Sequence, residues 1–239
     1  MGDRPLAGGT TATDNVAIGH LAGNSLTTSG NNVILGSKAG QGMTVAGSSH
    51  SGHNIIIGYR AGFYGTNLTT GAGNILIGAY SCNNAADGNY ANGLGYNICV
   101  DSGYTAVGQA GSDIRCAHGN VTWATVSDER VKKDIVDSTT GLSFVNALKP
   151  RTFKYKTLGE LPDTFNTYEA GSTEVFKNST TNHGFIAQEV KAAIDADSSI
   201  KDGFRLWDDR ADGSQEVAEA ALIPVLVKAI QELSTENKA

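Results

Sequence analysis

Proline, aromatic residues and charge are all scarce in this sequence of 239 residues, which contains 4 prolines, 7% aromatic residues and 18% charged residues. No apolar run approaches the length of a membrane-spanning helix, so we expect no membrane insertion. The first residues, MGDRPLAGGT, lack a basic segment followed by an apolar core, so we expect no cleavable signal peptide. A net charge of −6 argues against a nucleic-acid partner.

Glutamate is absent from the first 126 residues, and charge of either sign is rare there. This part holds 24 of the 30 glycines but only nine charged residues, and the other 33 charged residues lie in 127–239. Such a sharp change in composition marks a boundary between two kinds of structure. We therefore predict two domains, a glycine-rich β-repeat trunk at 1–126 and a second domain at 127–239.

The trunk repeats one phrase, which consists of asparagine, two small or aliphatic residues, an aliphatic residue and glycine. Copies begin at Asn15, Asn32, Asn54 and Asn74, and looser copies surround Gly95 and Gly108. The anchor glycines at 19, 36, 58, 78, 95 and 108 are separated by 17, 22, 20, 17 and 13 residues. A period near 20 residues is typical of solenoids, and each phrase predicts a short strand that ends at a glycine corner. We prefer this interpretation to disorder because the aliphatic residues stay in phase.

A single chain of this composition would have a thin core. We expect each rung to direct two or three aliphatic side chains inward, and few aromatic residues are available to add to them. A closed assembly of several chains would supply the missing partners and cover the exposed strand edges. The repeat aliphatics predicted to be buried in this oligomer are Ile18, Leu35, Ile57, Ile77 and Val107.

The repeated phrase resembles the head repeats of trimeric autotransporter adhesins and the repeats of phage tail fibres and tailspikes. Its nearest copy is Asp14–Gly19, which reads Asp-Asn-Val-Ala-Ile-Gly. The resemblance implies an N-terminal all-β trimeric solenoid, either a β-roll or a triple β-helix.

The second domain reads as an α+β segment that is mainly helical. We expect a helix at 142–148, a half-buried strand at 151–156, a helix from 183 to about 194 and a helix at 216–233. Pro224 should either kink the last helix or mark its first turn.

Three motifs in this domain resemble the endosialidase-type C-terminal intramolecular chaperone, which occurs at the ends of phage tailspikes, tail fibres and neck appendages. They lie at Ser127–Ile135, Gly184–Val190 and Leu222–Leu233. The resemblance implies a trimeric module that assembles a β-structured trunk and then cleaves itself off. The cut would fall between Val126 and Ser127, and the family's serine–lysine dyad maps onto Ser127 and Lys132.

The chemistry of such a dyad is reasonable, but its spacing needs explanation. A serine hydroxyl is a weak nucleophile until a base takes its proton, and a neutral lysine can serve as that base. Five residues along an α-helix rotate by about 140°, so Ser127 must precede the helix or Lys132 must act on a neighbouring chain. Alternatively, Ser127 only caps the helix. Asp128 and Arg130 are candidate supporting residues, which either orient the strand before the cut or cap the segment after it.

The cysteine and histidine residues are candidates for a disulfide or a metal site. Cys82, Cys99 and Cys116 are spaced by 17 residues, which is the local rung period. We favour buried thiols over a disulfide or a metal role for them. For His50 and His53 we favour a polar loop over a metal site. We expect no metal and no cofactor.

The combined features predict a phage tail fibre or tailspike in the virion tail, assembled in the host cytoplasm as a homotrimer. Its trunk would bind a host receptor or glycan and other phage tail proteins, and its only enzymatic activity would be self-cleavage. A bacterial trimeric surface adhesin is one alternative. A tailspike that degrades polysaccharide is another, but it calls for paired carboxylates, and residues 1–126 contain five scattered aspartates and no glutamate.

Overall fold

The computed structural model describes residues 2–9, 11–44, 52–200 and 204–238. The chain divides into two compact units, Met1–Lys133 and Asp134–Ala239. Each unit is described by itself. The boundary predicted between Val126 and Ser127 falls a few residues before this division, and it remains a prediction.

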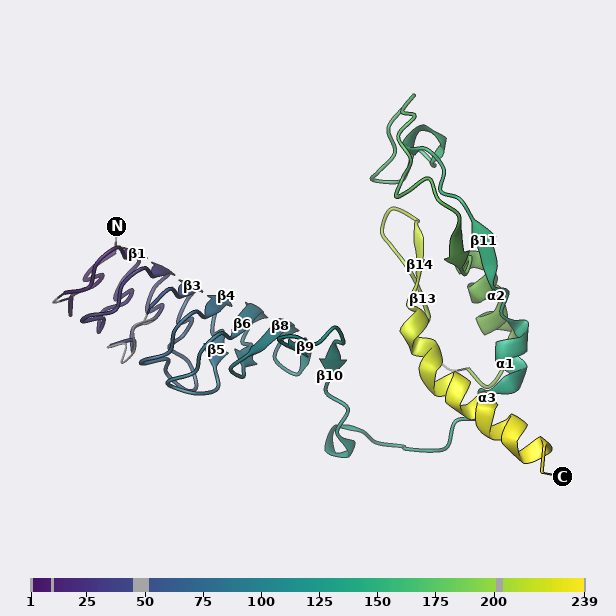
Figure 1. Ribbon diagram of the computed structural model, residues 1–239, viewed down its shortest axis with the longest axis horizontal. Coiled ribbons are helices and arrows are strands. Elements are labelled where there is room, and N and C mark those ends of the chain that lie inside the picture. The colour runs from purple at the N-terminus through teal and green to yellow at the C-terminus, as the bar shows by residue number, and fades with distance from the viewer. Residues whose placement is uncertain (1, 10, 45–51, 201–203, 239) are drawn as a thin grey trace. The chain divides into compact units, whose positions relative to one another are not determined.

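The first unit is a β-solenoid of about five turns, which confirms the predicted repeat architecture (Figure 1). Its main sheet runs in the order β1-β2-β3-β4-β6-β8-β9-β10. Parallel, in-register pairing joins the strands from β1 to β8 in this sheet. The strands of this unit are β1 (Val16–Ile18), β2 (Val33–Leu35), β3 (Ile55–Ile57), β4 (Ile75–Ile77), β5 (Cys82–Asn83), β6 (Asn92–Tyr96), β7 (Cys99–Val100), β8 (Tyr104–Gln109), β9 (Ser112–Ala117) and β10 (Ala124–Thr125).

Each of the strands β2, β3 and β4 turns one aliphatic residue inward. Ile34, Ile56 and Leu76 are fully buried, and Ile56 pairs in register with both of the others. The first and third residues of each three-residue strand point to the opposite face because side chains alternate along a strand. The rest of the inner core comes from the loops, where Ala22, Leu26, Ala39, Met43, Ala61 and Leu68 are buried.

The asparagine that opens each phrase forms a ladder through the rungs. The side-chain amide of Asn54 donates to Oδ1 of Asn32 at 3.0 Å, and that of Asn74 donates to Oδ1 of Asn54 at 3.0 Å. The backbone N–H groups of both residues donate to the same oxygens at 3.1 and 3.0 Å. Asn32 contacts Asn15 in the same way. Each rung is thereby hydrogen-bonded to the previous one in a buried position, which satisfies polar groups that would otherwise be costly.

The anchor glycines are required by the corners. Gly36 has φ +128° and Gly58 has φ +131°, values that disfavour other residues. A Cβ atom on Gly36 would lie 2.6 Å from the carbonyl oxygen of Gly58 on the next rung. The close stacking of the rungs therefore explains why the phrase ends in glycine.

A disulfide and a pair of antiparallel strands lie in the C-terminal part of the solenoid. Cys82 of β5 and Cys99 of β7 pair in register and form a disulfide, so the expectation of three thiols was wrong for two of them. The strand register places the two side chains together on consecutive rungs. Cys116 is free. The antiparallel strands β9 and β10 then end the sheet, with Ala124 opposite Arg115 and Thr125 opposite Ile114.

In its described residues, the second unit combines three α-helices with two antiparallel strand pairs. Its elements are α1 (Leu142–Ala147), β11 (Arg151–Phe153), β12 (Asn182–Gly184), α2 (Ala187–Ala196), β13 (Trp207–Asp209), β14 (Gln215–Val217) and α3 (Leu222–Glu236), with short 3₁₀-helices η2 (Leu158–Glu160) and η3 (Glu219–Ala221). Its core contains Phe144, Val190, Leu206, Leu222 and Val225. In the described part of the chain, each helix falls short of the length and apolar character that crossing a membrane requires.

Two predicted helix starts in this unit were too early. His183 lies in β12, opposite Thr152 of β11, and the helix begins only at Ala187. Residues 215–217 likewise pair with β13 before α3 begins at Leu222. At His183, pairing with a distant strand overrides the local helical pattern. At Glu216, a short hairpin with β13 does the same. Pro224 lies in the first turn of α3, where its missing N–H costs no intrahelical hydrogen bond.

Candidate active site

Ser127 and Lys132 meet within one chain. Lys132 Nζ donates a hydrogen bond to Ser127 Oγ at 2.7 Å. This is the separation at which a serine hydroxyl and an amine can exchange a proton. The structure therefore brings together the two residues singled out as a dyad and does not require a neighbouring chain to supply the lysine.

A single 3₁₀ turn makes this contact possible. The turn, η1 (Glu129–Val131), lies between the two residues, and the backbone N–H of Lys132 donates to the carbonyl of Glu129 at 2.9 Å. Lys132 itself has extended backbone, with φ −117° and ψ 153°. The α-helical rotation that would separate the pair does not apply, because the regular turn ends before Lys132 and begins after Ser127.

The cap of this turn is Asp128, so Ser127 is not the capping residue that the alternative interpretation requires. Asp128 Oδ1 accepts from the backbone N–H of Arg130 at 2.8 Å and from Arg130 Nε at 2.9 Å. Arg130 Nη2 also donates to Asp128 Oδ2 at 2.6 Å. These bonds from Arg130 lower the pKa of Asp128 and raise the pKa of Arg130. Asp128 and Arg130 thus hold the turn that carries Lys132, and neither residue donates to or accepts from Ser127 Oγ.

The site is open to solvent in the single chain. Val126 has 54% of its surface exposed, and Ser127 and Lys132 are exposed as well. The whole stretch from 118 to 139 is exposed, including the apolar residues Val131 and Val136, at 68% and 85%. In this geometry the amine donates to the serine, whereas a catalytic base must accept the proton of the hydroxyl. The geometry of a dyad is present, but its surroundings are still those of an exposed loop.

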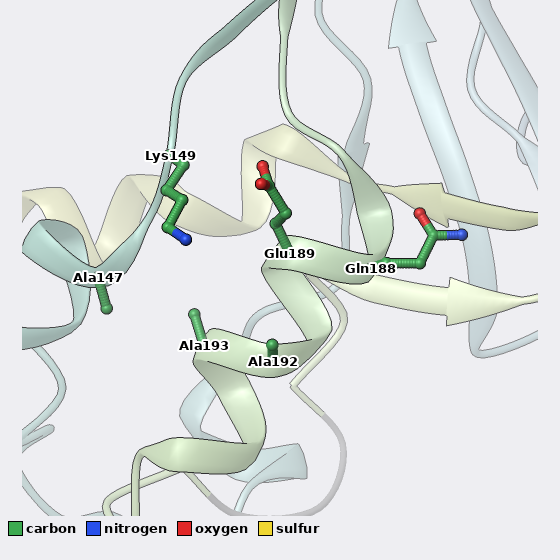
Figure 2. Close-up of a pocket in the computed structure, with 6 residues that line it drawn as sticks. All are labelled: Ala147, Lys149, Gln188, Glu189, Ala192 and Ala193. Atoms are coloured by element: carbon green, nitrogen blue, oxygen red, sulfur yellow. The ribbon is translucent and has the colours of Figure 1, made fainter.

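A separate depression lies in the second unit between the end of α1 and α2 (Figure 2). It has a volume of about 370 Å³ and is lined by Lys149, Glu189 and Gln188 together with Ala147, Ala192 and Ala193. Figure 2 shows the Gln188 side chain directed away from Lys149. Glu189 is engaged by Arg151, whose Nε donates to it at 2.9 Å, and this bond lowers the pKa of Glu189. The six lining residues include no serine, cysteine or histidine.

Of the two histidines considered for a metal site, the structure describes one. His50 lies outside the described residues, and His53 is exposed. Across the described ranges, no three histidine, cysteine, aspartate or glutamate side chains are grouped so that they could hold a metal ion.

Sequence reasoning missed the ion pair between Arg151 and Glu189. It also gave no role to the asparagine that opens each phrase, although its recurrence at 15, 32, 54 and 74 was visible and could have predicted the ladder.

One comparison with known proteins supports the interpretation of the second domain. Residues 127–198 match the family model of the chaperone of endosialidase. The match begins at Ser127, the first residue of the dyad, and includes the motif at Gly184–Val190. No curated protein and no solved structure matches the chain. The resemblance of the trunk to adhesin heads stays a prediction.

Proposed function

We propose, from the endosialidase-type chaperone domain that begins at Ser127 and the β-solenoid before it, that this chain is a trimeric phage tail fibre or tailspike protein. The solenoid would be the trunk that attaches to the host surface, and the domain after it would drive trimer folding. Self-cleavage between Val126 and Ser127 would then release the chaperone. The observation that carries the proposal is the 2.7 Å contact of Lys132 Nζ with Ser127 Oγ at the start of the matched domain.

The outward face of the solenoid sheet supports assembly of several copies. Val16 and Ile18 of β1 are 50% and 55% exposed, Ile55 of β3 is 36% exposed, Ile75 of β4 is 38% exposed and Leu94 of β6 is 53% exposed. These residues lie on in-register strands and form one aliphatic stripe. A continuous apolar stripe of this kind favours burial against another protein surface. Three copies of the same stripe around a common axis would bury all of them.

Helix α3 offers a second surface of the same kind. Ile223, Leu226, Ile230 and Leu233 are 60%, 42%, 64% and 42% exposed. Their spacing alternates between three and four residues, which is the pattern of a coiled-coil seam. An adjacent face of the helix already packs on the core through Leu222 and Val225. We infer that the stripe meets the same helix of the other copies.

The cleavage step follows from the dyad. Lys132, when neutral, accepts the proton of Ser127 Oγ, and the oxygen attacks the carbonyl carbon of Val126. A bond forms between Oγ and that carbon as the bond from the carbon to the nitrogen of Ser127 breaks, and the freed amine takes up the proton. Water then hydrolyses the resulting ester, which leaves a carboxylate on Val126 and restores the hydroxyl of Ser127.

Exposure of the dyad in the single chain provides a reason for coupling cleavage to assembly. A lysine becomes a better base when it is removed from water, because desolvation disfavours the charged amine. Trimer packing around the exposed stretch 118–139 would supply that environment. Cleavage would then follow correct assembly and would not occur in an isolated chain.

The test measures the intact mass and the native mass of freshly expressed full-length protein. We expect trimers whose subunits are split into fragments that end at Val126 and begin at Ser127. An intact chain that remains monomeric would contradict the proposal.

A further inference from the structure

Strand β10 attaches the segment before the proposed cut to the trunk sheet. Its second residue, Thr125, pairs with Ile114 of β9. The stretch 118–139 is exposed and described throughout, and β10 is the one strand within it. Thr125 is therefore the last residue that the sheet holds before the bond between Val126 and Ser127.

The pairing between β9 and β10 ends one residue before the proposed cut. If the antiparallel register continued, the residue after Thr125 would face Asp113, which precedes Ile114. The carbonyl of Asp113 instead accepts a hydrogen bond from Thr125 Oγ1 at 2.9 Å. The side chain of Thr125 thus engages the next position of the ladder, and Val126 lies outside the strand with 54% of its surface exposed. The peptide group of Val126 is open to a nucleophile, while the residue before it is held.

The other side of the scissile bond is held as well. Lys132 Nζ donates to Ser127 Oγ at 2.7 Å, and the turn η1 lies between these two residues. Only Val126 therefore separates the anchored Thr125 from the anchored Ser127. Because each residue has two soft backbone dihedrals, few rotations remain that could carry the carbonyl of Val126 away from Ser127 Oγ.

We propose that Thr125 is a positioning residue for cleavage, whose hydroxyl, bound to the carbonyl of Asp113, holds the acyl side of the scissile bond within reach of Ser127 Oγ. Thr125 contributes no atom to the bonds that form and break, and it acts through the backbone of Val126. Holding two reacting groups in the right geometry lowers the entropic cost of their encounter, and a small misplacement slows such a reaction strongly. The inference rests on the proposed function, and it specifies how the trunk takes part in the cleavage step.

A purely structural role for this hydroxyl predicts a different outcome from a positioning role. Thr125 is exposed on the last strand of the sheet, away from the buried core of the solenoid. Loss of one exposed hydrogen bond there should change the stability of the trunk little. Thr122 provides a comparison in the same exposed stretch, because its hydroxyl donates to Asn120 Oδ1 at 2.9 Å, inside the loop. The two threonines therefore differ in whether the hydroxyl holds the chain to β9.

The test follows cleavage of the full-length protein by intact mass, at intervals after a short pulse of cell-free synthesis. Thr125→Val keeps the branched shape of the side chain but removes the hydroxyl, and we expect cleavage to slow by roughly tenfold or more. Thr125→Ser keeps the hydroxyl and should retain most of the rate. Thr122→Val is the matched control and should cleave at close to the normal rate. The pH dependence of the remaining rate should keep its midpoint in Thr125→Val, because Lys132 is still the base.

Native mass and thermal unfolding are measured on the same samples. Equal slowing in Thr125→Val and Thr125→Ser would overturn the positioning role, as would a shifted pH midpoint in Thr125→Val. A loss of trimers or a lower melting temperature in Thr125→Val would assign the hydroxyl to folding instead. If the unchanged protein and Thr125→Val are cleaved at the same rate, only the role of Thr125 is refuted, whereas an unchanged protein that stays intact would refute the proposed function itself.

Discussion

The contact between Ser127 and Lys132 allows the proposed cleavage to be tested by changing two side chains one at a time. Ser127→Ala removes the nucleophile and Lys132→Ala removes the base, so each should slow cleavage on the order of 10³-fold. Because the two act as one unit, the double variant should be no slower than either single variant. The measurement is intact mass over time after expression.

Lys133→Ala is the matched control for this pair. It removes the same charge one residue further on, where no hydrogen bond to Ser127 is formed, so cleavage should proceed at close to the normal rate. Normal processing of the Ser127→Ala chain would assign the cut to a host protease and end the self-cleavage hypothesis.

Another residue-scale prediction concerns the asparagine ladder. Asn54→Ala removes the buried Oδ1 that accepts from both N–H groups of Asn74, and the Nδ2 that donates to Asn32 Oδ1 and to the carbonyl of Gly71. We expect the trunk to lose about 3 kcal/mol of unfolding free energy, since several buried polar groups would lose their partners. Denaturant unfolding of the full chain, followed at the trunk transition, measures this loss. Asn67→Ala, at an exposed position, should change the stability by less than about 0.5 kcal/mol, and equal effects of the two substitutions would show that the ladder contributes little.

At the scale of elements, the strands of the trunk are expected to meet other copies through their outward residues. Ile57 is the third residue of β3 and points away from the buried Ile56. Ile57→Asp would place a charge in the interface between copies, and we expect it to abolish heat-resistant trimers. Native mass spectrometry and gel mobility without heating measure the outcome. Asn67→Asp introduces the same charge off the sheet and should leave the trimers intact. Trimers that persist in Ile57→Asp would show that this stripe is not the interface.

The ion pair between β11 and α2 predicts a pH dependence of the second unit. Hydrogen bonding from Arg151 lowers the pKa of Glu189 in the folded state, so this pair stabilises the fold above the unfolded pKa of the carboxyl. That contribution disappears as pH falls through the lowered pKa.

Glu189→Gln should therefore melt a few degrees lower at neutral pH and should lose less stability on acidification. Thermal unfolding of the full chain between about pH 3 and 7 measures both effects. Glu169→Gln, at an exposed position, provides the comparison. A melting profile of Glu189→Gln with the same acid slope as the unchanged protein would rule out this role for the pair.

The elements that could be predicted from the sequence are those whose pattern lies within a few neighbouring residues. The aliphatic triplets and corner glycines were sufficient for the rungs, and Pro150 marked the end of α1. Sequence reasoning failed where residues with a helical pattern pair as strands, with a distant segment at His183 and in a short hairpin at Glu216. The helical period of the residues carries no sign of such pairing. It also could not tell which aliphatics face inward, since an alternating triplet is compatible with either face. The candidate dyad was proposed from its motif, but the 3₁₀ turn that brings Lys132 to Ser127 was not predicted.

For the whole molecule, the proposed chaperone should be necessary for folding of the trunk and dispensable afterwards. A chain that ends at Val126 should aggregate or stay monomeric when expressed alone, because its outward aliphatics would be exposed before partners are found. The same residues obtained by cleavage of the full chain should remain trimeric after the second unit is removed. Size-exclusion chromatography with light scattering distinguishes the two preparations. Soluble trimers from the truncated chain would refute the chaperone role.

The position of the last strand gives this scheme a further consequence. Strand β10 ends at Thr125, directly before the proposed cut, and Thr125 Oγ1 still donates to the carbonyl of Asp113 at 2.9 Å. Cleavage after Val126 would therefore remove no strand from the sheet. A processed trunk would keep every contact of the folded state while having lost the segment that guided it there. Its unfolding and refolding curves would not coincide. The lifetime of the folded fibre would then be set by its unfolding rate and not by an equilibrium free energy.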